Sequence, residues 1–440
     1  MQVSEESDDI PRPWLDRVGI FPPLAWGYLG LLLFMIGDGV EAGFLSLYLQ
    51  GMGYPGQDVG LIFTVYGVTA AISAWLSGAL SDLWGPRRVM QIGLAVWAVF
   101  HVAFLLLGVA QNNYAMMLAT YALRGFGYPL FAFGFLVWIT AVTPRYRLGT
   151  AVGWFWFAFT GGLPTLGSLL ARFLIPEIGH YQTLWTSLAL VLVGGAIALI
   201  GVRERTGRSR LAPAGENPVT TLILSVSIAW RAPKTAIGCL VRIINTAPQF
   251  GFFVFMPAYF TKVVGFSEAQ WLQLLSAMFV SNIIWNLLFG VIGDRLGWRR
   301  TIALCGGFGS AITTLLLYYT PATLGANYPL AVLAAVAYGA TLAGYVPLSA
   351  LMPSLAPQHK GAAMSLLNLG AGASVWVGPA IVTLFLPVAG VVGVMWIFAM
   401  LYLLSAVMTL FLTLPEYVTE DDRAPAVGEA QIELAGGGTR

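Results

Sequence analysis

The sequence predicts an all-α membrane protein with twelve transmembrane helices in two pseudo-symmetric six-helix bundles. Of its 440 residues, 58% are hydrophobic and 10% are charged, whereas a soluble domain carries about 25% charged residues. Twelve apolar runs reach about 20 residues, the length that a helix needs to cross a bilayer. A loop motif also occurs twice, half a chain apart. A fold of this size cannot hide so much apolar surface from water, so its solvent is lipid.

The repeated motif reads G-x-x-x-D-x-x-G-x-R-R, and each copy closes one apolar run and opens the next. The copies are offset by 212 residues, from Asp82 to Asp294. Their motif positions are Gly78, Asp82, Gly85, Arg87, Arg88, Gly290, Asp294, Gly297, Arg299 and Arg300. One copy could be ordinary loop arginines with helix-end glycines. Two copies in register indicate two related halves, an organisation that many transporters share.

The apolar runs place the elements in order along the chain. The first six spans are predicted near 24–49, 59–80, 89–110, 115–142, 150–173 and 182–202. The second six are predicted near 235–261, 270–292, 301–320, 328–352, 360–385 and 390–414. We therefore divide the chain into an N-terminal segment 1–23, a bundle 24–202, a linker 203–234, a bundle 235–414 and a disordered tail 415–440. Within the linker, 219–230 is apolar and could lie flat on the membrane.

Loop charges predict the orientation of the chain. The N-terminus, alternate loops and the tail hold 18 of the 22 lysines and arginines. Because positively charged loops stay on the cytoplasmic side, both termini and the linker should be cytoplasmic. We expect a multi-pass protein of the bacterial cytoplasmic (inner) membrane.

Three charged residues fall inside predicted spans of the first half. Asp38 and Glu41 lie three residues apart in the first span, on one helical face, and Arg124 lies in the fourth. Each such charge costs about 2.5–3.5 kcal/mol on insertion scales, so the three should face a cavity or one another. Pairing with Arg124 would offset that cost and would tune the proton affinity of the carboxylates. We expect Asp38 to carry a coupling proton and Glu41 to tune it, although a permanent ion pair that only fixes packing remains the alternative.

Polar side chains recur at helical spacing in the second half. They are Arg242, Asn245 and Gln249, then Asn282 and Asn286, then Tyr338, Thr341 and Tyr345, and finally Asn368. Such faces should turn inward, and groups that both donate and accept hydrogen bonds suit a ligand made of hydroxyls. In the first half, Tyr128 or Trp156 could stack on the carbon skeleton of such a ligand. The same residue types also join helices to one another in membranes, and Arg242 could contact substrate or serve an inner gate.

The histidines and cysteines predict no metal or cofactor site. His101 is expected on a peripheral helix, His180 in an outer loop near Glu177, and His359 at a helix start, so they form no cluster. The two cysteines, Cys239 and Cys305, have no histidine nearby.

The twelve spans, the 6+6 repeat and the doubled loop motif resemble the major facilitator superfamily, which implies the major facilitator fold. In that family the loop motif helps to latch the two halves on the cytoplasmic side. Four local strings are similar to the polyol permeases, bacterial carriers of ribitol and D-arabinitol. They are Phe34-Met-Ile-Gly-Asp-Gly-Val-Glu41, Gly153-Trp-Phe-Trp156, Val241-Arg-Ile-Ile-Asn-Thr246 and Lys360-Gly-Ala-Ala363. Proton-coupled sugar carriers of the superfamily use an acid on helix 1 with an arginine on helix 4, which implies the same role for Asp38 and Arg124.

The sequence thus predicts a monomeric secondary transporter that carries a linear polyol together with protons by alternating access. Its partners are the polyol, protons and the bilayer, and its net charge of +2 predicts no nucleic-acid partner. The alternative is a proton-coupled symporter of an organic anion such as α-ketoglutarate, with Arg124 and Arg242 on its two carboxylates. An enzyme is disfavoured because the chain offers neither a nucleophile with its base nor a clustered metal site.

Overall fold

The computed structural model describes residue 20 and residues 22–143, 148–211, 218–356 and 360–414. The tail 415–440 and most of the segment 1–23 therefore lie outside the described residues. Helices make up nearly all of the described chain, which contains no β-strand. The predicted all-α membrane fold is confirmed for this part of the protein.

The first half consists of helices that follow one another through short turns. Its α-helices are α2 (Ala25–Gly39), α3 (Leu45–Gly51), α4 (Gly56–Trp84), α5 (Pro86–Ala103), α6 (Tyr114–Arg124), α7 (Gly127–Val142), α8 (Leu148–Thr160) and α9 (Gly167–Gly201). Two π-helical segments, η2 (Phe104–Val109) and η4 (Gly161–Leu166), continue α5 and α8, and two short 3-10 turns are η1 (Pro22–Leu24) and η5 (Thr206–Arg208).

The linker and the second half follow the same plan. Their α-helices are α10 (Pro218–Arg231), α11 (Pro233–Ala258), α12 (Glu268–Leu296), α13 (Trp298–Thr301), α14 (Gly309–Leu324), α15 (Tyr328–Leu342), α16 (Leu348–Leu355) and α17 (Lys360–Leu410). The π-helical segments are η6 (Tyr259–Val263) and η7 (Ile302–Phe308), and η8 (Ala343–Tyr345) is a 3-10 turn.

Nine helical stretches in the described residues are long and apolar enough to cross a membrane. Two of them, 150–201 and 362–410, contain a glycine with positive φ, Gly179 at 79° and Gly390 at 66°. Glycine adopts this conformation without the clash of a Cβ atom, and the chain turns back at each position, so each stretch comprises two spans. The first predicted span is divided into α2, with 15 residues, and α3, with 7.

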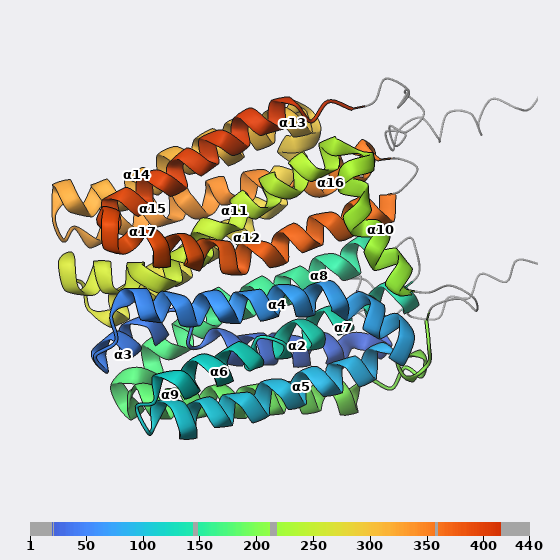
Figure 1. Cartoon of the computed structure of the whole chain (residues 1–440), viewed down its shortest axis with the longest axis horizontal. Coiled ribbons are helices and arrows are strands. Elements are labelled where there is room, and N and C mark those ends of the chain that lie inside the picture. Colours follow the sequence, from blue (N-terminus) through green and yellow to red (C-terminus); the bar gives the residue numbers. More distant parts are fainter. Residues whose placement is uncertain (1–19, 21, 144–147, 212–217, 357–359, 415–440) are drawn as a thin grey trace, which may run out of the picture.

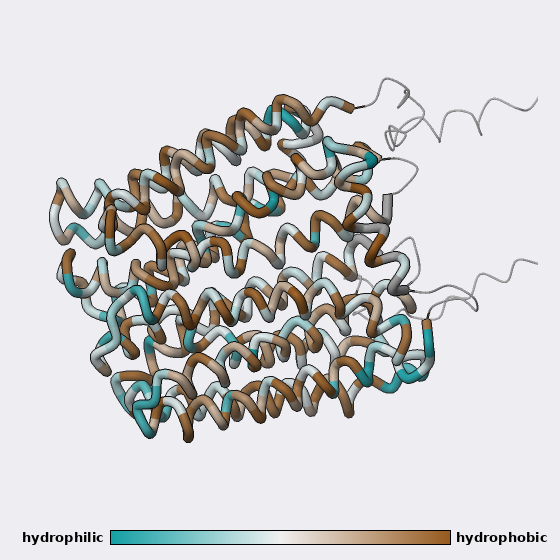
Figure 2. Tube along the Cα trace, viewed as in Figure 1, coloured by the Kyte–Doolittle hydropathy of each residue, from teal (hydrophilic) through white to brown (hydrophobic). Residues whose placement is uncertain are grey.

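The helices run side by side in two groups, one from each half of the chain (Figure 1). We call the end that carries α10 the linker end, and the end that carries α3 the distal end; the described chain begins and ends at the linker end. Helices α4 and α17 pack against each other where the two groups meet. Figure 2 shows hydrophobic residues along the helices and hydrophilic residues gathered towards their two ends, as expected of a chain surrounded by lipid.

Close packing of α2 against α9 carries the end of α2 into the interior of the first half. A Cβ atom on Gly30 would lie 2.5 Å from the carbonyl oxygen of Gly194, and one on Gly37 would lie 2.8 Å from that of Ser187. Only glycine permits such an approach. The Ser187 hydroxyl also donates to the Gly37 carbonyl at 2.6 Å. The residue after Gly37 is therefore held deep in the bundle.

Three hydrogen-bonded pairs of described residues join the two halves, and all lie in the distal half of the molecule. The Trp271 indole donates to the Gly43 carbonyl at 2.6 Å. The Ser276 hydroxyl donates to the Thr165 carbonyl at 3.0 Å. A bond of 2.9 Å joins His180 to Glu268, and the His180 ring stacks on Tyr48. These bonds hold the distal end closed.

Candidate functional site

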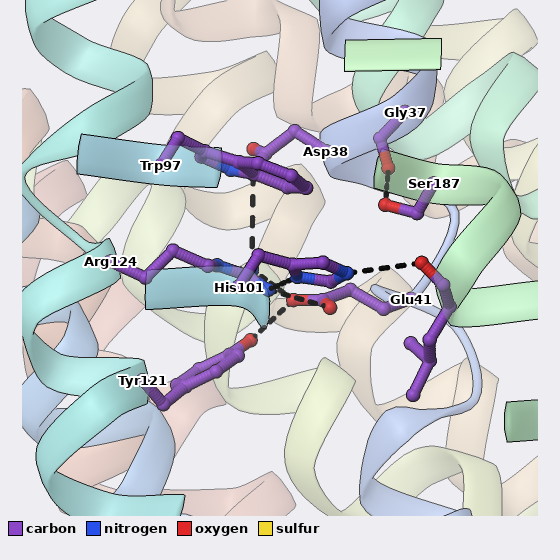
Figure 3. A network of polar contacts seen from close by, with 9 residues as sticks. Gly37, Asp38, Glu41, Trp97, His101, Tyr121, Arg124 and Ser187 are labelled. Atoms are coloured by element: carbon purple, nitrogen blue, oxygen red, sulfur yellow. Dashed lines mark hydrogen bonds and ion pairs between the residues drawn. The ribbon is translucent and has the colours of Figure 1, made fainter. Parts of the chain in front are cut away.

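The two acidic residues of the first predicted span lie where its helix is interrupted. Asp38 is in the last turn of α2, whereas Glu41 lies in the non-helical stretch 40–44 between α2 and α3. The expectation of one continuous helical face was therefore wrong. Both side chains are nevertheless buried and point towards Arg124, the last residue of α6 (Figure 3). The structure thus brings together the three charges that the sequence singled out.

Arg124 divides its contacts unequally between the two carboxylates. One guanidinium nitrogen, Nη1, donates to Glu41 Oε2 at 2.9 Å, and Nη2 donates to Glu41 Oε1, so Glu41 is bound by two parallel bonds. Asp38 Oδ1 lies 3.8 Å from Nη2, beyond hydrogen-bond distance. Paired forks of this kind are the strongest charge-assisted bonds in proteins. Glu41 is therefore the fixed partner of Arg124.

Asp38 is held instead by a neutral donor. The Trp97 indole donates to Asp38 Oδ1 at 2.6 Å, and no other described side chain donates to this carboxylate. Glu41 additionally accepts from the Tyr121 hydroxyl at 2.7 Å. Of the two acids, Asp38 thus has the fewer bonds to lose when it takes up a proton.

The guanidinium lies among aromatic rings. Its central carbon is 4.5 Å from the ring centre of Tyr121, 4.9 Å from that of Trp97 and 5.4 Å from that of Tyr66. Rings at such distances attract a cation through their electron-rich faces. The Nε–H of Arg124 is buried without a hydrogen-bond partner, so the guanidinium keeps unused donor capacity.

His101 completes this network. Arg124 Nη1 donates to His101 Nδ1 at 2.8 Å, and the ring Nε2 lies 3.0 Å from the carbonyl oxygen of Leu184 on α9. The side chain is fully buried, and the expectation that His101 packs on a peripheral helix away from the charges was wrong. A single guanidinium and two carboxylates give the cluster a net charge of −1 while Asp38 is ionised, and a proton on Asp38 brings it to zero.

Sequence reasoning missed three members of the network, namely Trp97, His101 and Tyr121. A signal was present, because Trp97 and His101 are four residues apart on α5 and Tyr121 precedes Arg124 by three on α6. Both spacings place polar atoms on one helical face. The bends and the break that bring these faces together have no comparably clear sequence pattern.

In the second half, one face of α11 carries polar groups without partners. Arg242 is partly buried, and no described carboxylate lies within ion-pair distance of it. The Oδ1 atom of the buried Asn245 accepts no hydrogen bond. Gln249, partly buried, follows one turn later on α11. Buried polar atoms that stay unpaired are costly, so this face is suited to a ligand that supplies the missing bonds.

The other predicted lining residues of the second half are engaged in packing contacts. Asn282 donates to the carbonyl of Gly339 at 3.1 Å, and Asn286 donates to Asn282 at 3.1 Å. The hydroxyl of the fully buried Tyr338 bonds that of Tyr402 on α17 at 2.8 Å. These contacts favour the role of joining helices. Tyr345 likewise bonds Ser405, whereas Asn368 is exposed.

The two aromatic candidates of the first half differ in their surroundings. Tyr128 on α7 is buried, and its ring stacks on Tyr66, which itself lies against Arg124. Trp156 on α8 is 39% exposed and meets Phe159 edge-on. Tyr128 therefore adjoins the charged cluster, whereas Trp156 does not contact it.

The repeated motif has the same local structure in both halves. Gly85 and Gly297 end α4 and α12 with φ of 86° and 89°. Arg87 then donates to carbonyls at the end of α9, Leu199 among them, and Arg299 donates to Leu410 and its neighbour at the end of α17. These bonds stay within one half, so a latch between the halves remains a prediction.

The remaining motif positions add little to this picture. The backbone carbonyl of Asp82 accepts from the Leu211 amide at 3.0 Å. Arg88 and Arg300 are exposed, and Gly78 and Gly290 have open space beside them. The side chain of Asp294 lies outside the described residues, as does His359.

Comparison with known proteins identifies the family. The Major Facilitator Superfamily sequence profile matches residues 27–285 and 238–435. The chain belongs to the major facilitator superfamily. A crystal structure of the nucleoside transporter NupG, another twofold assembly of helices, superposes with a TM-score of 0.69 at 15% identity, covering 89% of this chain and 99% of that one. At that identity the likeness concerns the fold alone.

Three curated relatives from this superfamily cover nearly the whole chain. The alpha-ketoglutarate permease of Bacillus subtilis (strain 168) is 45% identical over 92% of this chain and 93% of its own length. The D-arabinitol transporter of Klebsiella pneumoniae is 38% identical over 91% and 94%. The ribitol transporter of the same species is 39% identical over 87% and 90%. The resemblance to polyol carriers is thus confirmed, and the family and these relatives are transporters rather than enzymes.

Proposed function

We propose that this superfamily member is a secondary active symporter that carries a linear polyol of the ribitol or arabinitol class together with a proton. The observation that carries the coupling is the unequal sharing of Arg124. Glu41 has both strong guanidinium bonds, whereas Asp38 has one indole bond and a contact of 3.8 Å. Asp38 is therefore the carboxylate that exchanges a proton, and Glu41 is the fixed counter-ion.

The cluster gives the proton a mechanical consequence. A proton on Asp38 removes the net negative charge of a buried site, which lowers the cost of moving that site through a closed, water-excluding state. Loss of the proton restores the attraction between Asp38 and Arg124 across 3.8 Å. Substrate bound between the halves would move with the proton, because the halves rock around the site in carriers with this architecture.

Polyol binding is assigned to the unpaired face of α11. Asn245 and Gln249 can each donate and accept, which matches a row of hydroxyl groups. Tyr128, beside the coupling cluster, is the aromatic surface proposed for the carbon skeleton. The similarity to the two Klebsiella polyol carriers supports this substrate class.

One observation favours a second candidate, an organic dianion such as α-ketoglutarate. Arg242 is a partly buried cation without a described counter-ion, and a carboxylate would supply one. The similarity to the Bacillus permease points the same way. Against it, Arg124 is already bound by Glu41 and does not offer a second cationic anchor.

One experiment decides between the two. Purified protein in proteoliposomes with an imposed pH gradient, acid outside, is tested for uptake of labelled ribitol, D-arabinitol and α-ketoglutarate. We expect accumulation of a polyol, proton entry measured by an internal pH dye, and no inhibition by excess cold α-ketoglutarate. Accumulation of α-ketoglutarate alone would establish the second candidate, and uptake that ignores the pH gradient would refute proton coupling.

We further propose that the protein lies in the bacterial cytoplasmic membrane as a monomer with the linker end in the cytoplasm. The distribution of lysines and arginines supports this orientation. Labelling of single cysteines introduced at the exposed Arg88 and Gln182, at opposite ends of the helices, tests it in intact cells.

A further inference from the structure

The protonation of the His101 ring follows from its two partners. Arg124 Nη1, which can only donate, lies 2.8 Å from Nδ1, so Nδ1 carries no proton. The Leu184 carbonyl, which can only accept, lies 3.0 Å from Nε2, so Nε2 carries the proton. His101 is therefore a neutral imidazole that accepts from the arginine and donates to α9. The Trp97 ring stacks on it at 4.4 Å.

A count of the Arg124 donors shows what this contact controls. The guanidinium has five N–H groups. Nη1 uses both of its hydrogens, on Glu41 and His101, and Nη2 uses one on Glu41. The Nε–H is unpaired, and the other Nη2 hydrogen has Asp38 as its nearest acid, at 3.8 Å. The position of the guanidinium between the two carboxylates is thus set partly by which acceptor holds Nη1.

We infer that His101 is the positioning residue of the coupling site: its Nδ1 holds Arg124 on Glu41 and thereby keeps the guanidinium away from Asp38. This inference rests on the proposed role of Asp38 as the proton carrier. Loss of the acceptor leaves one Nη1 hydrogen buried without a partner, which is costly. Asp38, which has only one hydrogen bond, is the acceptor nearest to the freed donor. The guanidinium then moves towards Asp38 and stabilises its ionised form.

The bond from His101 to Leu184 extends the control to another helix. Leu184 lies on α9, the helix that also donates to the end of α2 through Ser187. The imidazole therefore ties the arginine to the same helix that fixes the backbone beside Asp38 (Figure 3). A shift of α9 relative to α5 would move the acceptor away from Arg124. In this way helix movement during transport changes the proton affinity of Asp38.

Two substitutions separate the two ring nitrogens. His101→Asn keeps an acceptor near the position of Nδ1 and loses the donor to Leu184. His101→Gln keeps a donor near the position of Nε2 and loses the acceptor for Arg124. Each variant gives up one of two buried hydrogen bonds, so the pair is matched for general destabilisation, which is checked by thermal unfolding in detergent.

The primary measurement needs no substrate. Infrared difference spectra of the purified protein during a pH titration follow the carboxylic acid C=O band of Asp38, which is identified by its absence in Asp38→Asn. We expect His101→Gln to move the titration midpoint of this band to lower pH by about one unit, since an approaching cation acts on that scale. His101→Asn should restore most of the wild-type midpoint. Equal midpoints in wild type and His101→Gln, or equal shifts in both variants, would overturn the inference.

A transport measurement on the same variants separates this inference from the proposed function. Uptake of labelled ribitol, D-arabinitol and α-ketoglutarate is recorded against external pH in proteoliposomes. If the wild type accumulates one of them, His101→Gln should shift the alkaline limb of its profile to lower pH by about one unit, while His101→Asn should not. Absence of pH-driven uptake in the wild type would refute the proposed function and leave the infrared outcome to decide on His101.

Discussion

The charged cluster of the first half and the polar face of α11 in the second half treat their polar atoms in opposite ways. In the cluster, Arg124, Glu41 and His101 satisfy one another, and only the Nε–H of Arg124 is left over. On α11, Arg242 has no described counter-ion and Asn245 keeps an unpaired oxygen. A self-satisfied group of charges suits coupling, whereas unsatisfied groups suit a ligand. The difference indicates that the two halves have divided these tasks.

The division is visible at positions related by the repeat. With the offset of 212 residues, Asp38 corresponds to Phe250 and Arg124 to Val336. Phe250 packs against the hydrophobic cores of both halves. The duplicated scaffold has therefore kept its helices while the second copy has no charge at these two places. Four substitutions test how complete the division is, from the largest expected effect to the smallest.

The largest effect is expected from Asp38→Asn. The amide can still accept from Trp97 but binds no exchangeable proton, so the cluster stays at its neutral charge. Accumulation driven by a pH gradient should fall to the level of protein-free liposomes, whereas exchange of internal for external substrate should continue. Paired measurement of gradient-driven uptake and exchange checks this. Retained accumulation would remove Asp38 from the coupling role.

Glu41→Gln should mainly cost stability. It leaves a buried guanidinium with only Asp38, at 3.8 Å, as a charged partner, and breaking a buried pair costs about 3–5 kcal/mol. Thermal and denaturant unfolding in detergent measure the loss. The matched control is Glu177→Gln at an exposed acid of α9, for which a change within about 0.5 kcal/mol is expected. Equal stability of the two variants would show that the Arg124–Glu41 pair is dispensable.

Arg242→Gln tests the ligand side of the comparison. Loss of a charge-assisted bond costs about 1.5–3 kcal/mol, and loss of a neutral bond about 0.5–1.5 kcal/mol. The apparent affinity for a polyol should therefore fall by no more than about tenfold, and that for α-ketoglutarate by roughly ten- to a hundredfold. Arg242→Lys, which keeps the charge, is the control. An unchanged affinity for every transported solute would place Arg242 outside the binding site.

The smallest effect is expected where the halves meet at the distal end. His180 and Glu268 are partly exposed, with 31% and 21% of their side chains accessible, and exposed ion pairs contribute about 0–1 kcal/mol. Glu268→Gln should make opening of the distal end easier and accelerate exchange by up to about fivefold, an effect that high salt should diminish. Exchange rates at low and high ionic strength, beside those of Glu177→Gln, check this.

Sequence reasoning reached the fold and the charges because both produce large energies. Apolar runs of membrane-spanning length and charges inside them, such as Asp38 and Arg124, leave strong signals in a single sequence. The break at 40–44 was missed, because the chain there contains no proline and only one glycine, Gly43, and follows a regular apolar run. His101 was missed for a different reason. A neutral imidazole is common in helix packing, and its importance depends on a partner contributed by another helix.

The tyrosines of the second half show the opposite error. Tyr338 and Tyr345 were expected to face a ligand because buried hydroxyls need partners. Their partners are Tyr402 and Ser405, both on α17, about 60 residues away. The need for a bond was readable from the sequence, but the choice between a ligand and another helix depends on tertiary packing. Tests of substrate contact are therefore better directed at Asn245 and Gln249.

The arginines of the repeated motif have a consequence for how the carrier is assembled. Arg87 and Arg299 each fasten the final helix of their own six-helix unit to its third, so neither unit borrows a seal from the other. The backbone of Leu211 is likewise anchored on Asp82 of the first unit. A gene severed within 212–217 should accordingly encode two polypeptides that fold separately and dock in the bilayer into a working carrier.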